Sequence, residues 1–314
     1  MIKPLVSYVV PVFNKSHAIR STLTSLLHQV GPFEAEFIFV DDASTDNSIE
    51  ILEGHNDARI KVIKNSDNRG PAVRLNQGAR LAKGDFLQFV DADDILARGA
   101  TAEMLQILLR ENAEVIYGKW KLTGETADNL LQEEVSPGQG YSVSDKPLQY
   151  VLTHKRIVRM VLMTTKACFT ASGGCDEAIF VQDESLPLRL AAKTKRFVDF
   201  SGTTIYVPAH GESNLSNNKI QQHHDGFCAY RNAIEQLQNI DTCCAQLLYK
   251  KAVSIVWKHY RRNMSGSIFS FLFLQYLCSK VFTNIPSSEK LANLYKFFDN
   301  FQSQIRRPDA QVNI

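Results

Sequence analysis

Two nearly continuous apolar runs, Val6–Val12 and Phe37–Val40, constrain the fold of this 314-residue chain more than any other feature. Strands that helices cover on both faces of a parallel sheet have this pattern. Between the two runs, residues 19–30 carry leucine and isoleucine at helical spacing. Two further runs, Ile60–Ile63 and Phe86–Val90, flank a second helical pattern. This alternation predicts an α/β fold with a Rossmann-like, mostly parallel sheet flanked by helices.

The chain changes character after Pro208, where a polar turn is followed by helical patterns. We therefore expect an α/β domain over residues 1–216 and a helical C-terminal region over residues 217–314. The net charge is +2, which gives no reason to expect a nucleic acid partner. From Lys250 onward, however, ten basic residues face three acidic ones. This excess of positive charge favours an anionic partner at the C-terminal end.

The six cysteines lack the C-x-x-C spacing of metal and redox sites, and no signal peptide precedes the first strand. No apolar stretch reaches the ~20 residues that a membrane-spanning helix needs. We expect reduced thiols in a cytoplasmic protein that could lie on the inner face of the membrane.

Residues 248–262 predict a basic amphipathic helix. On a helical wheel the basic residues fall on one side, and the apolar and aromatic residues fall on the other. Such helices bind anionic membrane surfaces. The alternative is that the apolar side packs within the protein while the charges face water. The Phe-rich stretch Phe269–Phe273 favours contact with a membrane or a partner.

Four polar clusters lie where ligands bind to open α/β sheets, at predicted strand ends or in loops. They are Pro11–Asn14, Asp41–Asp46, Asp91–Asp94, and Gly173–Glu177 with Gln182 and Asp183. An Asp-x-Asp sequence after a strand can hold a hard divalent cation, because carboxylate oxygens are its preferred ligands. The alternative for any one cluster is a solvated turn or a helix cap.

Together these motifs resemble the family 2 glycosyltransferases, inverting enzymes with the GT-A fold. The resemblance extends from Val6 to Ser216 and also includes Asn68-Arg-Gly, Asn76-Gln-Gly and Lys83-Gly-Asp. It implies that residues 1–216 form a nucleotide-sugar-binding catalytic domain.

The resemblance implies a nucleotide-binding set. Pro11 and Phe13 would form an apolar wall for the base, and Asp42 would accept a hydrogen bond from a base N–H. Uracil offers such an N3–H and cytosine does not, which favours a UDP-sugar donor. Asp91 would lie near the ribose or a metal-bound water, and Arg69 is a candidate cation for the diphosphate. The alternative for Phe13 is packing in the core.

The resemblance also implies a metal site, with Asp93 as the direct ligand of Mn²⁺ or Mg²⁺. Such an ion would offset the charge of the leaving diphosphate. His210 lies where some relatives place a residue that binds the metal or the diphosphate, and the alternative is a surface histidine.

Asp183 matches the general base of the family, which would remove the proton of the attacking acceptor hydroxyl. The alternative is a helix N-cap. The chain departs from the family pattern nearby, because Gln182 replaces a glutamate and Cys175 replaces an aromatic residue that faces the sugar. Arg74 stands one place before the usual arginine, and one residue rotates a helical side chain by ~100°, so it is an unsafe phosphate ligand.

The sequence thus predicts a metal-dependent inverting glycosyltransferase of the hexosyl or N-acetylhexosaminyl class. It would act on a saccharide or lipid-linked acceptor in envelope polysaccharide synthesis. Two alternatives stay open: a non-catalytic nucleotide-sugar-binding or scaffold protein, and a nucleotidyltransferase. The second lacks support, because no Gly-rich phosphate-binding motif is present.

Overall fold

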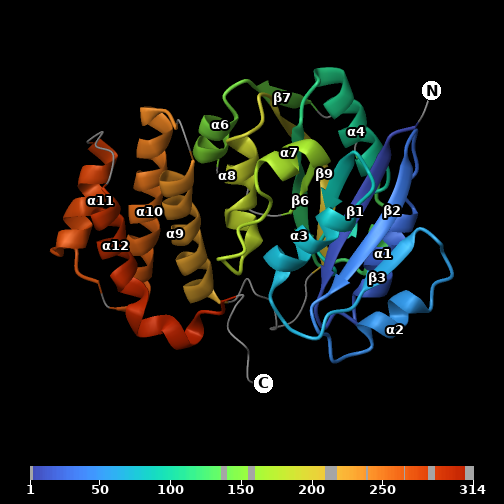
Figure 1. Ribbon diagram of the computed structural model, residues 1–314, viewed down its shortest axis with the longest axis horizontal. Helices are drawn as coiled ribbons and strands as arrows, with labels where there is room; N and C mark the ends of the chain where they lie inside the picture. Colours follow the sequence, from blue (N-terminus) through green and yellow to red (C-terminus); the bar gives the residue numbers. More distant parts are fainter. Residues whose placement is uncertain are drawn as a thin grey trace.

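The computed structural model describes residues 3–135, 140–154, 160–208, 218–237, 240–264, 266–281 and 287–307. Its centre is a nine-stranded sheet with the order β3-β2-β1-β4-β8-β6-β9-β5, in which β7 also pairs with β9 (Figure 1). The strands are β1 (Leu5–Val12), β2 (Glu34–Asp41), β3 (Ile60–Ile63), β4 (Phe86–Phe89), β5 (Ile95–Leu96), β6 (Val115–Thr123), β7 (Tyr141–Ser144), β8 (Leu162–Thr165) and β9 (Phe197–Pro208).

The first four strands are parallel to one another, and they coincide with the four apolar runs. Beyond β4 the sheet is mixed, because β8 runs antiparallel to both β4 and β6. The expected α/β fold is confirmed, with this mixed half as a feature that apolar patterns do not reveal. Right-handed crossovers place α1 and α2 on one face of the first four strands and α3 on the other.

The helices of the α/β domain are short, and most of them connect strands. They are α1 (Ile19–Leu27), α2 (Ser48–Glu53), α3 (Pro71–Leu81), α4 (Ala100–Glu111), α5 (Ala127–Leu130), α6 (Pro147–Thr153), α7 (Lys166–Ala171) and α8 (Leu186–Ala191). A 3₁₀ helix, Gln182–Glu184, directly precedes α8. Proline occupies the first turn of α3, where its missing N–H costs no helical hydrogen bond.

The C-terminal region is helical, as expected, and forms the end of the molecule opposite β3 (Figure 1). It consists of α9 (Lys219–Gln236), α10 (Thr242–Asn263), α11 (Phe271–Val281), α12 (Ser288–Tyr295) and the 3₁₀ helix Lys296–Gln304. Its buried apolar side chains join those of the sheet in one continuous core cluster. None of the described helices combines the length and apolar character needed to span a membrane.

The apolar side of residues 248–262 is buried inside the protein. Val253 and Val256 are fully buried. The ring centroid of Trp257 lies 4.9 Å from that of Phe273, in a tilted arrangement, and 6.1 Å from that of Tyr276, in a stacked one. This side of the helix therefore does not face a membrane, and the packing alternative describes it correctly. Exposed apolar residues of the C-terminal region occur in and just before the next helix, where Phe271 is 80% exposed.

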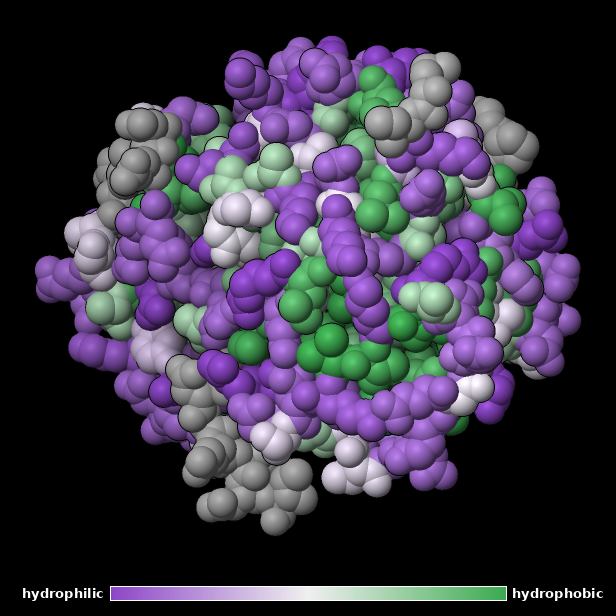
Figure 2. Space-filling model, turned by 45° about the vertical axis from the view of Figure 1, so that its right-hand side comes forward, coloured by the Kyte–Doolittle hydropathy of each residue, from purple (hydrophilic) through white to green (hydrophobic). Residues whose placement is uncertain are grey.

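The surface at the end of the molecule that holds β1–β3 differs from α11 in hydropathy. Figure 2 brings the side with β1–β3 forward, and hydrophilic residues dominate it around a central hydrophobic area.

All six cysteines are unpaired, in agreement with the expectation of reduced thiols.

Candidate functional site

The site lies where the strand order reverses. β1 pairs with β2 on one side and with β4 on the other, all in parallel, so the loops after these strands meet at one edge of the sheet. In open α/β sheets the ligand crevice lies at such a switch point. The sequence-predicted clusters at Phe13, Asp42 and Asp91 follow these three strands. Pro11 and Phe13 are both half-buried, so each keeps part of its surface available at this edge.

Asn14 connects the loops after β1 and β2. Its backbone adopts a left-handed conformation with φ of +52°, which asparagine tolerates better than most residues. The side-chain Oδ1 accepts a hydrogen bond from the Thr45 N–H at 2.8 Å, and the Asn14 N–H donates to Ser44 Oγ at 3.0 Å. The two loops are therefore held together as one unit.

The Asp42 carboxylate holds the turn after β3 in place through hydrogen bonds to Arg69 and Gly70. It is only 4% exposed, and its carboxylate accepts hydrogen bonds from the backbone N–H groups of Arg69 and Gly70, each at 2.8 Å. The Arg74 Nε donates to the same carboxylate at 2.6 Å. Asp42 thus has a structural role that the sequence did not reveal, alongside the predicted contact with a base.

Arg74 is buried and bound to Asp42, which makes it a poor candidate for a phosphate ligand. Its side chain is 4% exposed and also donates to the carbonyl of Asp67. The one-residue displacement of this arginine therefore changes its role, as the helical rotation implied. Arg69 is different, since its side chain is 39% exposed and lies 4.0 Å from the Asp67 carboxylate. It is the better candidate for contact with a diphosphate.

The Asp-x-Asp sequence directly follows β4. Asp91 and Asp93 are half-buried, while Asp94 is buried and its N–H bonds to the Asp91 carbonyl at 3.1 Å. The Lys15 Nζ lies 2.5 Å from Asp93 Oδ2, so an ammonium group from the loop after β1 pairs with the predicted metal ligand. The sequence analysis missed Lys15, although it directly follows the Pro11–Asn14 cluster.

The described side chains near Asp93 supply only some of the ligands that a divalent cation needs. Among the residues that the structure describes, no three His, Cys, Asp or Glu side chains are grouped to hold a metal ion. The half-buried Asp93 carboxylate is a suitable hard ligand for an ion that completes its shell with water and phosphate oxygens. His210 lies outside the described residues.

The loop over residues 173–177 is fixed by α3 and α8. Asn76 in α3 accepts from the Cys175 N–H at 2.8 Å and donates to the Glu177 carboxylate at 2.8 Å. Arg189 in α8 donates to the carbonyl of Gly174 at 2.7 Å. Cys175 is buried, and burial raises the pKa of its thiol.

Asp183 lies half-buried in the 3₁₀ helix, after the buried Gln182. The irregular segment before this helix packs against the turn that Asp42 holds after β3, because a side chain at Gly70 would meet the Phe180 ring at 2.7 Å. Gly70 also has φ of +85°, so glycine is needed there for both backbone and space. The segment that leads to the predicted base therefore contacts the predicted nucleotide-binding turn. Glu184 follows, and burial raises the pKa of its carboxyl.

Comparison with known proteins agrees with this geometry. The sequence profile of glycosyl transferase family 2 matches residues 7–175, more than half of the chain. An uncharacterized glycosyltransferase of Haemophilus influenzae is 34% identical over 122 residues, which are 38% of this chain and 48% of the relative. The Escherichia coli UDP-Glc:alpha-D-GlcNAc-diphosphoundecaprenol beta-1,3-glucosyltransferase WfgD is 32% identical over 134 residues, 42% of this chain and 51% of that protein. The chain thus spans about half the length of these relatives.

Solved structures share the fold over nearly the whole chain. Staphylococcus aureus TarS 1–349 in complex with UDP-GlcNAc has a TM-score of 0.62 at 16% identity, and the match covers 96% of this chain and 92% of that one. The mannosyltransferase PcManGT of Pyrobaculum calidifontis, in complex with GDP-Man and Mn²⁺, has a TM-score of 0.60 at 16% identity, covering 97% and 85%. At these identities the likeness concerns the fold.

Proposed function

Because the chain belongs to glycosyl transferase family 2, we propose that it transfers a hexose or N-acetylhexosamine from a UDP-sugar to a hydroxyl group, with inversion. The acceptor is a saccharide or a lipid-linked saccharide of envelope polysaccharide synthesis. WfgD, by its name, uses UDP-Glc and a diphosphoundecaprenol-linked acceptor, and TarS was solved with UDP-GlcNAc. The site, and not the likeness alone, carries the proposal.

The observation that carries the proposal is the packing of the Asp183 segment on the Asp42 turn through Phe180 and Gly70. In this arrangement Pro11 and Phe13 flank the base, and Asp42 accepts its N–H. Arg69 and Asp91 are assigned to the diphosphate and the ribose, respectively. Asp183 removes the proton of the acceptor hydroxyl as that oxygen attacks the sugar.

We assign Mn²⁺ or Mg²⁺ to Asp93, with His210 as a further candidate ligand. A bound ion would offset the negative charge of the departing diphosphate. The mannosyltransferase solved with Mn²⁺ supports an ion in this fold. Lys15 must release Asp93 before the ion can bind, since its ammonium lies 2.5 Å from that carboxylate.

The catalytic work is assigned to residues 1–216, and contact with an anionic membrane surface to residues 217–314. No aspartate or glutamate occurs from residue 242 to residue 288, whereas six lysines and arginines do. Phe271, 80% exposed, is the first residue of α11, the helix at the edge of the molecule in Figure 1, and Phe269, 92% exposed, lies in the turn just before it. Exposed aromatic side chains in a sequence region that carries only positive charge suit an anionic lipid surface. The docking face is thus α11 with the basic side of α10, and not the apolar side of residues 248–262.

The proposal is tested in two steps. A screen of UDP-sugars with and without Mn²⁺ first identifies the donor, and single-turnover kinetics then measure the rate of sugar transfer. Asp183→Asn keeps the shape of the side chain but loses the base, so transfer should fall by about 10²–10⁴-fold. UDP affinity should stay within about threefold of wild type. Glu184→Gln in the same 3₁₀ helix is the matched control and should transfer normally.

A transfer rate of Asp183→Asn within threefold of wild type would exclude this residue as the base and direct the search to Glu184 or Glu177. A wild-type protein that binds UDP but turns over no donor in the screen would instead support the non-catalytic nucleotide-sugar-binding alternative.

A further inference from the structure

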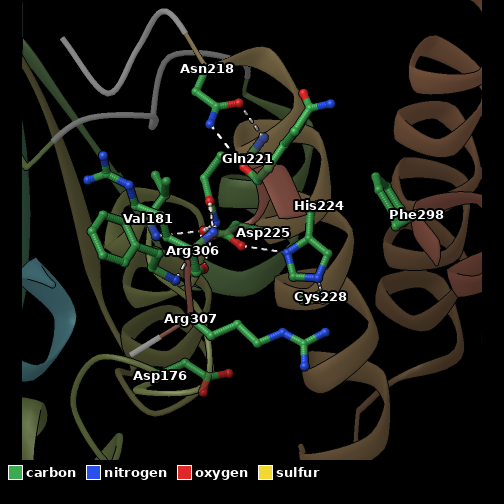
Figure 3. Close-up of polar contacts among 12 residues, drawn as sticks. Asp176, Val181, Asn218, Gln221, His224, Asp225, Cys228, Phe298, Arg306 and Arg307 are labelled. Atoms are coloured by element: carbon green, nitrogen blue, oxygen red, sulfur yellow. Dashed lines mark hydrogen bonds and ion pairs between the residues drawn. The ribbon is translucent and has the colours of Figure 1, made fainter. Parts of the chain in front are cut away.

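A buried carboxylate of the C-terminal region holds the backbone that leads to Asp183. Asp225 in α9 has no solvent exposure, and its Oδ2 accepts hydrogen bonds from the N–H groups of Phe180 at 3.0 Å and Val181 at 2.7 Å (Figure 3). These two residues directly precede the 3₁₀ helix that carries Asp183. Two consecutive N–H groups bound to one oxygen fix the direction of the chain at that point.

Asp225 is itself fixed by its neighbours on α9. Gln221 Nε2 donates to Oδ2 at 2.9 Å, and His224 Nδ1 lies 2.7 Å from Oδ1. A buried carboxylate is stable only when donors compensate for its lost hydration. With four donors around it, Asp225 meets this condition, so its position is tightly determined.

The support extends to the end of the described chain. Gln221 accepts from the Arg306 N–H at 2.6 Å and donates to the Arg306 carbonyl at 3.2 Å. The Arg306 guanidinium lies 5.8 Å from the centre of the Phe180 ring, on the segment that Asp225 holds. His224 Nε2 lies 3.2 Å from Tyr295 Oη. Asp225 from α9 and Arg306 from the C-terminal end therefore meet at residues 180–181 (Figure 3), and Tyr295 of α12 contacts His224.

A second contact from α9 reaches the same part of the site. Asn232, two turns after Asp225, donates to the Asp176 carboxylate at 2.8 Å. It supports the 173–177 loop but makes no contact with residues 180–181 in any described hydrogen bond. The two contacts come from one helix and differ in the segment that they hold.

We propose that Asp225 is a positioning residue for sugar transfer: it sets the Phe180–Val181 backbone and thereby aims Asp183 at the acceptor hydroxyl. The C-terminal helices are then part of the catalytic apparatus, in addition to any role as a docking face. The inference rests on the proposed function of Asp183 as the base.

The physical expectation is a loss of alignment and not a loss of donor binding. A displacement of about 1 Å at a reacting group can lower a rate by about 10²-fold. The proposed nucleotide contacts come from other segments, the loops that follow β1, β2, β3 and β4. Removal of Asp225 should therefore lower kcat and leave the affinity for UDP unchanged.

The experiment compares Asp225→Ala, Asp225→Asn and the control Asn232→Ala, with kcat expressed per UDP-binding site as counted by calorimetry. Asp225→Ala should lower kcat by about 10–100-fold, with the donor KM and the Kd for UDP within threefold of wild type. Asp225→Asn should restore kcat to within about fivefold, because the amide oxygen can still accept from Phe180 and Val181. Asn232→Ala should retain kcat within threefold.

An Asp225→Ala protein that transfers sugar at the wild-type rate would overturn the inference, provided that Asp183→Asn is impaired. If Asp183→Asn is unimpaired, the base assignment fails first. Should Asp225→Ala not fold, Gln221→Ala decides. It removes one donor to Asp225 and the link to Arg306, and it should lower kcat by about 3–10-fold with unchanged UDP affinity. A wild-type kcat in Gln221→Ala would then overturn the inference.

Discussion

The pair of Asp42 and Arg74 gives the sharpest test of how the site is built. The two side chains are 5% and 4% exposed, and Arg74 Nε lies 2.6 Å from the carboxylate. Removal of one partner of a buried ion pair typically costs about 3–5 kcal/mol, because the other charge is left without compensation. Asp42→Ala also leaves the N–H groups of Arg69 and Gly70 without their acceptor. It should therefore lie at the upper end of that range.

Arg74→Leu should cost less, about 1–3 kcal/mol, because Asp42 keeps its two backbone donors. In the double variant the losses should overlap by about 1–3 kcal/mol. At roughly 2–4 °C per kcal/mol for a domain of this order of size, a loss of about 5 kcal/mol in Asp42→Ala should lower Tm by about 10–20 °C. Thermal unfolding of the four proteins measures these values directly.

Calorimetry with UDP, performed well below Tm, separates the structural role of Asp42 from the base contact. Arg74→Leu should bind UDP within about threefold of wild type, since the carboxylate remains. Asp42→Ala should lose about 1.5–3 kcal/mol of binding free energy, the value of a charge-assisted hydrogen bond. A Tm change below 2 °C for Asp42→Ala, or strictly additive losses in the double variant, would refute the structural role of Asp42.

Three further outcomes are expected. Lys15→Met should lower the Mn²⁺ concentration needed for half-saturation, measured by calorimetry, because the ammonium no longer competes for Asp93; unchanged Mn²⁺ affinity would argue against a shared site. Burial, together with a neighbouring histidine and nearby cations, lowers the pKa of His223 to about 4, so the folded protein keeps this ring neutral. The contribution of the neutral ring to the free energy of unfolding should be complete above about pH 6.5 and should decline as the pH falls toward 4. The Tm of His223→Gln should therefore depend less on pH between these values than the Tm of wild type. The same dependence of Tm on pH in both proteins would contradict this. Phe269→Ser with Phe271→Ser should reduce sedimentation with anionic liposomes and leave donor hydrolysis unchanged, whereas wild-type protein that does not sediment at low salt would exclude this docking face.

The sequence by itself determined the first half of the sheet and the edge that holds the site. The apolar runs at Val6–Val12 and Phe37–Val40 are long enough to specify strands buried on both faces, and parallel order follows from the helices between them. Once the strands are parallel, the polar residues after them must meet at one edge. The sequence alone therefore suffices to group Phe13, Asp42 and Asp91 at this edge.

Only the tertiary structure decided what these residues touch. Lys15 and Asp93 are 78 residues apart, Asp42 and Arg74 are 32 apart, and Val181 and Asp225 are 44 apart. Periodicity specifies which side of an element is buried, but it carries no information about the element that covers it. The apolar side of residues 248–262 is the clearest case, since the same pattern fits a lipid surface or a neighbouring helix. The choice depends on long-range packing, in which the lost hydration of each buried charge must be compensated by a specific partner from elsewhere in the chain.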